Sequence, residues 1–144
     1  MQLRRIALLF AATLLLLLAT SVPAQAGKVV DNSGHRVGWA SWAKVLNRKG
    51  TMKGFLVHAG HAQYCLMTPA EKLIAAIESR TTPVRLWVDI DHRTRKTWRG
   101  KALRVGDNWA LYKKVAGGHW VRKGTAFGGR GATAVAALRL LLWK

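Results

Sequence analysis

The chain has 144 residues, and 24 Lys and Arg against 6 Asp and Glu give a formal charge of +18. This length and the 50% apolar content predict one small domain, because each of two domains would have too little interior. The charge makes anions the expected partners. The single Cys excludes an intrachain disulfide and a zinc site built from several thiolates.

The N-terminus has the three parts of a secretory signal. Arg4-Arg5 precedes an apolar run over 6–20, and Ala24-Gln25-Ala26 has the small-x-small pattern that signal peptidase cleaves. We expect a signal peptide over 1–26, cleavage after Ala26 and a secreted or periplasmic protein; the alternative is an uncleaved anchor helix. The domain 27–144 would keep a charge of +16, since cleavage removes only two basic side chains, and would have no stable transmembrane span.

Two stretches that are offset by 16 residues share one pattern. Residues 30–39 and 46–55 both contain an apolar residue, Asx, two polar residues, Gly, three further residues, Gly and an aromatic residue. Asx-x-x-Gly predicts a turn between two short strands, and the second Gly predicts a bulge or a close backbone approach. Residues 120–128 repeat the pattern in part, without the Asx.

These stretches resemble the units of the 5-fold β-flower proteins, a family of secreted bacterial proteins. Units of that family are similar to apolar-x-Asp-x-x-Gly-x-x-x-Gly, and its chains end in small and hydrophobic residues similar to 132–142. The resemblance covers 27–56 and, less closely, 120–142, whereas the middle of the chain departs from the pattern. It implies a hairpin-rich fold and no specific function.

One helix is predicted in the middle of the chain. Thr68-Pro69-Ala70-Glu71 fits a capping box with Pro at the first helical position. Leu73, Ile74 and Ile77 would then form an apolar stripe. We therefore expect a helix over about 68–80.

The remaining segments predict strands. Residues 84–90 alternate apolar and polar side chains, which is typical of a strand with one buried face. Further strands are expected over 97–105, 109–115 and 119–127, the last two joined by a turn at Gly117-Gly118. The expected fold is mainly β, a short-hairpin β-meander or open barrel with one inserted helix, after an N-terminal signal segment.

The apolar run 132–143 is too short to span a bilayer and contains Arg139. Its composition suits either a helix or a central strand. We expect it to be buried in the core, with contact to a membrane surface as the alternative.

Two clusters have side chains that could bind a metal. His58, His61 and Cys65 could ligate zinc or copper, but no carboxylate is near them in the sequence and the positive field opposes a dication. We expect two exposed histidines and a buried thiol, with pairing between chains as the alternative for Cys65, and no metal or other cofactor. Asp89 with Asp91-His92 could support a small secreted metal-assisted hydrolase or nuclease, although ion pairs with neighbouring basic residues explain them equally well.

The most widespread pattern is Trp next to Lys or Arg. Aromatic faces stack on bases or sugar rings, and basic side chains neutralise phosphates, sulfates or uronates. We therefore predict a non-catalytic exported protein that binds an anionic polymer or membrane surface, such as lipopolysaccharide, a cell-wall polymer, anionic lipid or DNA. The alternative places several of these Trp in the core. The predicted binding residues are Trp42, Lys44, Arg85, Trp87, Arg93, Arg95, Lys96, Trp98, Arg99, Lys113, Lys114, Trp120, Arg122 and Lys123.

Overall fold

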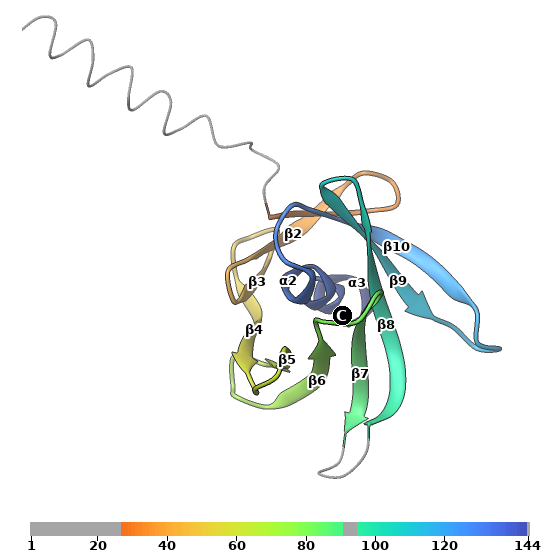
Figure 1. The fold of residues 1–144 in the computed structure, drawn as a ribbon. Helices are drawn as coiled ribbons and strands as arrows, with labels where there is room; N and C mark the ends of the chain where they lie inside the picture. Colours follow the sequence, from red (N-terminus) through yellow and green to blue (C-terminus); the bar gives the residue numbers. More distant parts are fainter. Residues whose placement is uncertain (1–26, 91–94, 144) are drawn as a thin grey trace, which may run out of the picture.

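Ten β-strands and two short helices make up the part of the chain that the structure, a computed structural model, describes (Figure 1). That part comprises residues 27–90 and 95–143, with the side chains of 27–88 and 97–143. The strands are β1 (Lys28–Asp31), β2 (Arg36–Ser41), β3 (Lys44–Asn47), β4 (Met52–His58), β5 (Gln63–Met67), β6 (Leu73–Glu78), β7 (Val84–Ile90), β8 (Arg95–Val105), β9 (Asn108–Lys114) and β10 (Trp120–Phe127). The helices are α2 (Gly131–Ala136) and α3 (Leu138–Leu142).

The strands form one closed antiparallel barrel. Each strand pairs with its neighbours in the sequence, and β1 pairs with β10, where Val29 lies opposite Ala126 and Asp31 opposite Gly124. The prediction of a mainly β fold is therefore confirmed. The meander is closed rather than open, so none of the ten described strands is left with an unpaired edge.

The prediction of a helix over 68–80 is wrong, because this range contains a turn and the strand β6. Thr68 to Lys72 form a turn, in which the Thr68 hydroxyl oxygen accepts a hydrogen bond from the Lys72 N–H at 3.0 Å. Glu71 has a φ of +62°, which is outside the right-handed helical region. The residues that predicted a helix cap instead close the hairpin between β5 and β6, because a Thr hydroxyl can bond backbone N–H groups in both kinds of structure.

The side chains of β6 follow a strand alternation. Ala75 and Ile77 are fully buried, whereas Ile74 and Ala76, which alternate with them, are only half-buried. A helix would place Ile74 and Ile77 on one face. Pairing with β5 and β7 satisfies the backbone of β6 on both sides, and this tertiary pairing overrides the local helix signal.

The other predicted strands are confirmed. Residues 84–90 form β7, with Val84 and Leu86 buried, and β8, β9 and β10 lie within two residues of the predicted bounds. At the turn from β9 to β10, Gly117 and Gly118 have φ angles of +84° and +81°. The Gly118 N–H donates to the Val115 carbonyl at 3.1 Å.

Asp31 and Asn47 close the first two hairpins in the same way. The side-chain oxygen of Asp31 accepts hydrogen bonds from the N–H groups of residues 33 and 35, both at 2.9 Å. The side-chain oxygen of Asn47 accepts from residues 49 and 51, at 3.0 and 2.9 Å. Gly34 and Gly50 then take φ angles of +80° and +81°, a conformation that favours Gly.

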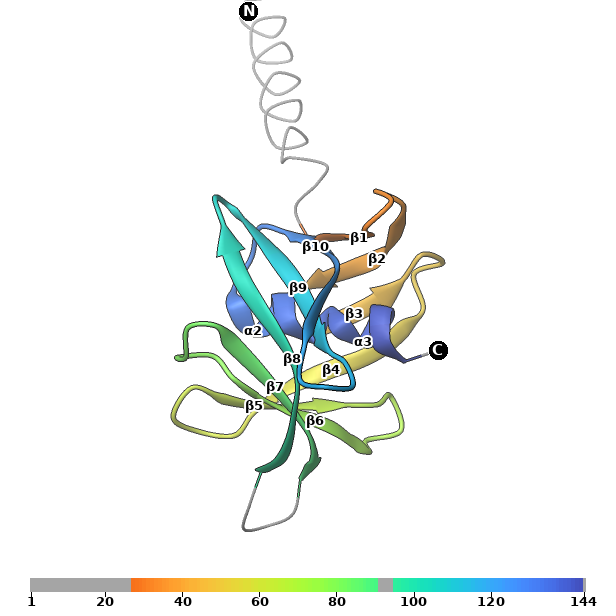
Figure 2. The same cartoon turned by 90° about the vertical axis from the view of Figure 1, so that its right-hand side faces the viewer.

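The C-terminal run is helical; most of residues 132–138 are buried as expected, whereas residues 139–143 are half-buried. Figure 1 looks along the barrel with α2 and α3 in its middle, and Figure 2 shows them crossing its interior. A ten-stranded barrel is wider than the eight-stranded size that side chains alone can fill, so the helices supply the missing interior. Their buried residues are Ala132, Ala134, Val135, Ala136, Ala137 and Leu138.

Glycines at shifts in strand register leave room for α3. A Cβ at Gly38 would overlap the Leu46 carbonyl oxygen and lie 2.8 Å from Leu140 Cδ1. A Cβ at Gly100 would lie 2.5 Å from Leu138 Cδ1. The register shifts beside both glycines. At Gly38 the predicted bulge or close backbone approach is therefore confirmed.

Candidate anionic-polymer interface

Three Trp rings form a row on the outer face of the barrel. Trp87 on β7 and Trp98 on β8 lie opposite each other in the sheet, with ring centroids 6.1 Å apart. Trp120 on β10 continues the row, with its ring centroid 4.9 Å from that of Trp98. Trp87 follows the fully buried Leu86, so strand alternation directs the indole away from the core. All three Trp are half-buried, which leaves part of each ring accessible.

Cationic side chains lie over these rings. The Arg85 guanidinium is 4.4 Å from the centroid of Trp98. The Lys101 ammonium is 4.4 Å from the centroid of Trp120 and 5.3 Å from that of Tyr112. Because Arg85 and Lys101 are directly opposite across β7 and β8, their like charges repel. Attraction to the ring faces offsets part of that repulsion.

Lys114 completes the cluster. Its ammonium is 5.9 Å from the ring centroids of both Trp98 and Trp120, and its side chain is exposed. We call the cluster the Trp–Lys patch. It consists of Arg85, Trp87, Trp98, Lys101, Tyr112, Lys114 and Trp120.

Two buried donors in the patch have no hydrogen-bond partner within the described part of the chain. They are Nε of Arg85 and Nε1 of Trp87. By contrast, Nε1 of Trp98 donates to the Gly100 carbonyl at 2.9 Å. A buried donor without an acceptor is costly. Because the surrounding residues cover both atoms, the exposed parts of the patch are its ring faces and the ammonium of Lys114.

Glu78 borders the patch. It lies directly opposite Arg85 across β6 and β7, and residues in such a pair share one face of the sheet. A carboxylate on this border disfavours an anion over β6. The surface suited to an anion therefore extends over β8, β9 and β10.

The structure brings together six of the predicted binding residues. Five are in the patch, and Arg122 adjoins it because it lies opposite Tyr112 across β9 and β10. The sequence-based prediction missed Lys101 and Tyr112 as binding residues. Only the strand register, which pairs Lys101 with both Arg85 and Tyr112, reveals their place. The six are Arg85, Trp87, Trp98, Lys114, Trp120 and Arg122.

The other predicted binding residues are not part of the patch. Trp42 and Lys44 lie at the turn between β2 and β3. Arg99 is exposed at the register shift in β8. Among the described residues, Lys113 and Lys123 have no cation–π contact with the rings of the patch. Arg93 lies outside the described residues, as do the side chains of Arg95 and Lys96.

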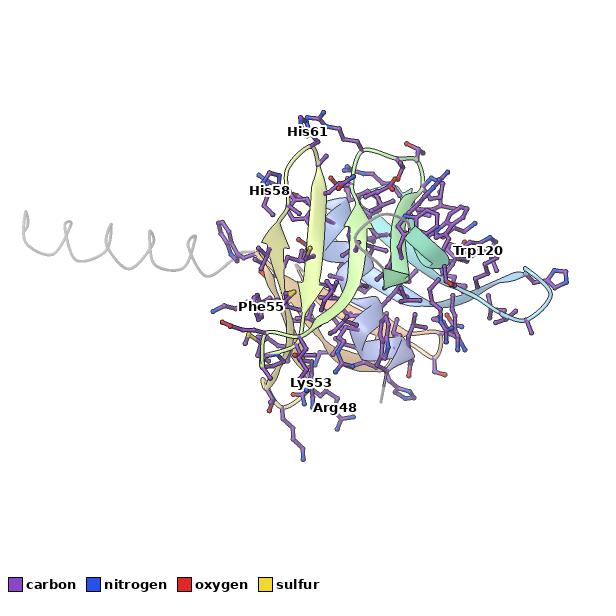
Figure 3. The ribbon with its side chains drawn as sticks, turned by 90° about the horizontal axis from the view of Figure 1, so that it is seen from below. Arg48, Lys53, Phe55, His58, His61 and Trp120 are labelled. Atoms are coloured by element: carbon purple, nitrogen blue, oxygen red, sulfur yellow. The ribbon has the colours of Figure 1, made fainter. Side chains whose placement is uncertain are left out.

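The patch occupies one side of the barrel only. Figure 3 shows Trp120 on the opposite side from Phe55 and Lys53 of β4. This placement agrees with the strand order, in which β4 and β9 are half the barrel apart. Lys53 is exposed, and it is therefore a charge-matched control for the lysines of the patch.

The candidate metal ligands His58, His61 and Cys65 are not grouped into a metal site. Among the described residues, no three His, Cys, Asp or Glu side chains are grouped to hold a metal ion. His58 and His61 are exposed as predicted, and the His58 ring packs edge-on against Tyr64 with centroids 5.1 Å apart. The predicted burial of Cys65 is only partial: it is a free thiol that alternates with the core residue Leu66 on β5 and so faces outward.

The alternative prediction is a metal-assisted hydrolase site at Asp89, Asp91 and His92. Asp91-His92 and the side chain of Asp89 lie outside the described residues, as does the predicted signal peptide over 1–26. No helix in the described part of the chain is long and apolar enough to cross a bilayer. Comparisons of the chain with protein-family models, curated proteins and solved structures found no match.

Proposed function

We propose that this protein is a non-catalytic exported module that binds an anionic polymer or surface through the Trp–Lys patch. The row formed by Trp87, Trp98 and Trp120, with cations over its rings, supports this proposal. Rings of a polymer would stack on the accessible indole surface, while Lys101 and Lys114 bind its anionic groups.

A retention experiment at rising salt concentration tests the proposal and ranks the ligands. The ligands are immobilised heparin, DNA and lipopolysaccharide, and vesicles of anionic phospholipid. Each basic side chain that contacts a phosphate releases counterions, so log affinity falls linearly with log salt. We expect Lys101→Ala to weaken retention and, on double-stranded DNA, to reduce the slope by about 0.9. Lys53→Ala removes the same charge from β4 and is expected to leave binding nearly unchanged.

The aromatic contribution needs a separate variant. Trp120→Ala removes a stacking surface without removing charge, so it is expected to weaken binding while the salt slope stays constant. Stacking on one base contributes about 1–3 kcal/mol in single-stranded nucleic-acid complexes. Equal losses in Lys101→Ala and Lys53→Ala would show that net charge alone binds the polymer. Absence of retention near physiological salt on all four ligands would overturn the proposal.

Export is a second part of the proposal, and it depends on the sequence of residues 1–26. Mass spectrometry of the protein recovered from the periplasm or the medium is expected to find Gly27 at its N-terminus. An intact N-terminus in a membrane fraction would instead support the anchored alternative. This measurement is independent of the binding experiment.

We also propose that the chain is a 5-fold β-flower protein whose hairpins are copies of one unit. The consecutive hairpins β1–β2, β3–β4, β5–β6, β7–β8 and β9–β10 support this proposal, since the register shifts once within each of them. The equivalent hydrogen bonds of Asp31 and Asn47 give further support. An experimental structure in which the hairpins superpose around the barrel axis is the expected outcome, and hairpins of unrelated geometry would contradict it.

A further inference from the structure

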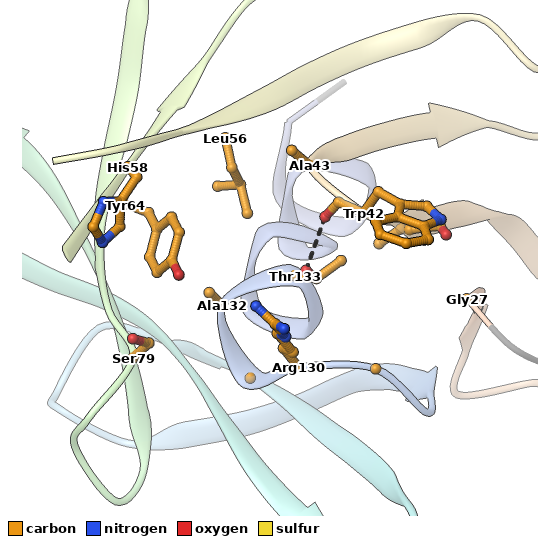
Figure 4. A pocket seen from close by; sticks show the side chains of 14 residues that line it. Gly27, Trp42, Ala43, Leu56, His58, Tyr64, Ser79, Arg130, Ala132 and Thr133 are labelled. Atoms are coloured by element: carbon orange, nitrogen blue, oxygen red, sulfur yellow. Dashed lines mark hydrogen bonds between the residues drawn. The ribbon is translucent and has the colours of Figure 1, made fainter. Parts of the chain in front are cut away.

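A cavity of about 820 Å³ opens at the end of the barrel where successive hairpins are connected. Its walls come from β2, the turn between β2 and β3, β4, β5, the end of β6 and the first residues of α2 (Figure 4). Cavities of about 300–1,000 Å³ are typical of small-molecule sites. The cavity is on a different part of the barrel from the Trp–Lys patch, and the two share no residue.

Apolar side chains form part of the cavity wall, and polar groups are added by Ser41, His58, Ser79 and Thr133. Leu56 lies between the aromatic residues Tyr64 and Trp42 in Figure 4, and Ala132 lies on the opposite side. Tyr64 also packs against the core and against the His58 ring. The apolar part of this lining suits a hydrocarbon chain, because contact with these side chains removes apolar surface from water.

One Arg belongs to the lining, and it is exposed. Arg130 immediately precedes α2, and Figure 4 shows its side chain between Tyr64 and Trp42. Within the described residues its guanidinium has no hydrogen bond or ion pair, and the lining of the cavity contains no Asp or Glu. A guanidinium has five N–H donors in a fork that matches a carboxylate or a phosphate. The cavity therefore presents an available anion-binding group beside apolar side chains.

Trp42 adds a second observation at the rim. Its φ is +56°, which is uncommon for a bulky residue, and 91% of it is exposed. The Thr133 hydroxyl donates to the Trp42 carbonyl at 3.1 Å, so α2 contributes to holding the turn. Trp42 lies in the two-residue turn between β2 and β3, where a positive φ is usual, and its exposed indole is available to contact a ligand at the rim.

We infer that the cavity binds a single-chain anionic amphiphile, with its carboxylate or phosphate head on Arg130 and its hydrocarbon chain against Leu56, Tyr64 and Trp42. A free long-chain carboxylate and a monoacyl phosphate share this chemistry. Binding at this site does not depend on the polymer-binding function of the Trp–Lys patch.

Isothermal titration calorimetry with decanoate, decyl phosphate and decanol tests the inference. The protein is used as it is purified from the cells that produce it, with whatever N-terminus those cells leave on it. Decanoate and decyl phosphate are expected to bind at one site, and their relative affinities distinguish the two sources of the head group. Decanol, which lacks the charge, is expected to bind at least tenfold more weakly, because a charge-assisted hydrogen bond is replaced by a neutral one.

Variants assign the site. Arg130→Ala is expected to lower decanoate affinity about tenfold or more and to leave decanol affinity unchanged. Its side chain makes no cap hydrogen bond, so circular dichroism is expected to match the parent. Arg48→Ala, at the turn between β3 and β4, removes the same charge and is expected to have no effect. Trp42→Ala is expected to weaken decanoate and decanol alike.

The inference has clear contradicting results. Unchanged decanoate affinity in Arg130→Ala, or equal losses in Arg130→Ala and Arg48→Ala, would overturn it, as would the absence of decanoate binding. Lys101→Ala is expected to bind decanoate normally. Loss of decanoate binding in Lys101→Ala, with Arg130→Ala unaffected, would assign the ligand to the Trp–Lys patch instead.

Discussion

The ammonium of Lys101 lies 4.4 Å from the ring centroid of Trp120, although strand β9 separates their strands in the sheet. The two side chains meet above β9, where Tyr112 lies below the same ammonium at 5.3 Å from its ring centroid. This contact connects three strands across the outer face. It also concentrates a positive charge next to an aromatic surface, which is the property that the proposed function requires.

This contact predicts energetic coupling between Lys101 and Trp120. In a double-mutant cycle with Lys101→Ala and Trp120→Ala, we expect a coupling of about 0.5–1 kcal/mol, the usual size of a cation–π interaction that is partly accessible to water. Urea unfolding of the four proteins measures it. Additive effects of the two substitutions would contradict the contact.

The approach of α3 to the sheet predicts a compensating pair. Gly100→Ala is expected to lower the free energy of unfolding by about 1–3 kcal/mol, because its Cβ would meet Leu138 Cδ1. Leu138→Ala alone is expected to cost about 2–5 kcal/mol, since Leu138 is fully buried. The double variant is expected to lose less than the two single losses together, because Leu138→Ala removes the atom that clashes. Equal or greater loss in the double variant would contradict this packing.

The first two turns predict a local stabilising role for their Asx residues. Asn47→Ala removes an acceptor from the N–H groups of residues 49 and 51 and is expected to lower the free energy of unfolding by about 1 kcal/mol. Asn47→Asp keeps an oxygen at the same position and is expected to retain most of that stability. Chemical unfolding measures both variants, and a loss in Asn47→Asp as large as in Asn47→Ala would argue against the hydrogen bonds.

The C-terminal helices are predicted to be essential for a well-packed barrel. Deletion of residues 131–144 removes Ala132, Ala134 to Leu138 and their contacts with the inner faces of the strands. The side chains of ten strands cannot fill the interior without them, so we expect loss of cooperative thermal unfolding and binding of a hydrophobic dye. A sharp transition in the shortened chain, similar to that of the full chain, would contradict this role.

Local patterns of the sequence were sufficient for much of the strand structure. The alternation in residues 84–90 predicted β7 because one face of that strand meets the core, so neighbouring residues have opposite environments. The Asx and Gly residues of 31–34 and 47–50 predicted turns because their backbone requirements are local. The apolar composition of 132–143 predicted burial without deciding between helix and strand.

The residues over 68–80 show where such patterns fail. The hydroxyl of Thr68 can cap a helix or close a hairpin, so the same residues at the start of the segment are compatible with both structures. The choice depended on β5 and β7, which lie on either side of β6 and complete its hydrogen bonds. A segment considered by itself contains no information about those partners.

By itself, the sequence determined the excess of positive charge, the hairpin turns and the presence of Trp beside basic residues. Only the tertiary structure decided which of these residues act together. Barrel closure and strand register placed Lys101 between Arg85 and Tyr112 and brought Trp120 to Trp98, while they left Trp42 at a separate cavity. The physical reason is that a binding surface consists of side chains from several strands, and the register of those strands is set by the packing of the whole barrel around α2 and α3.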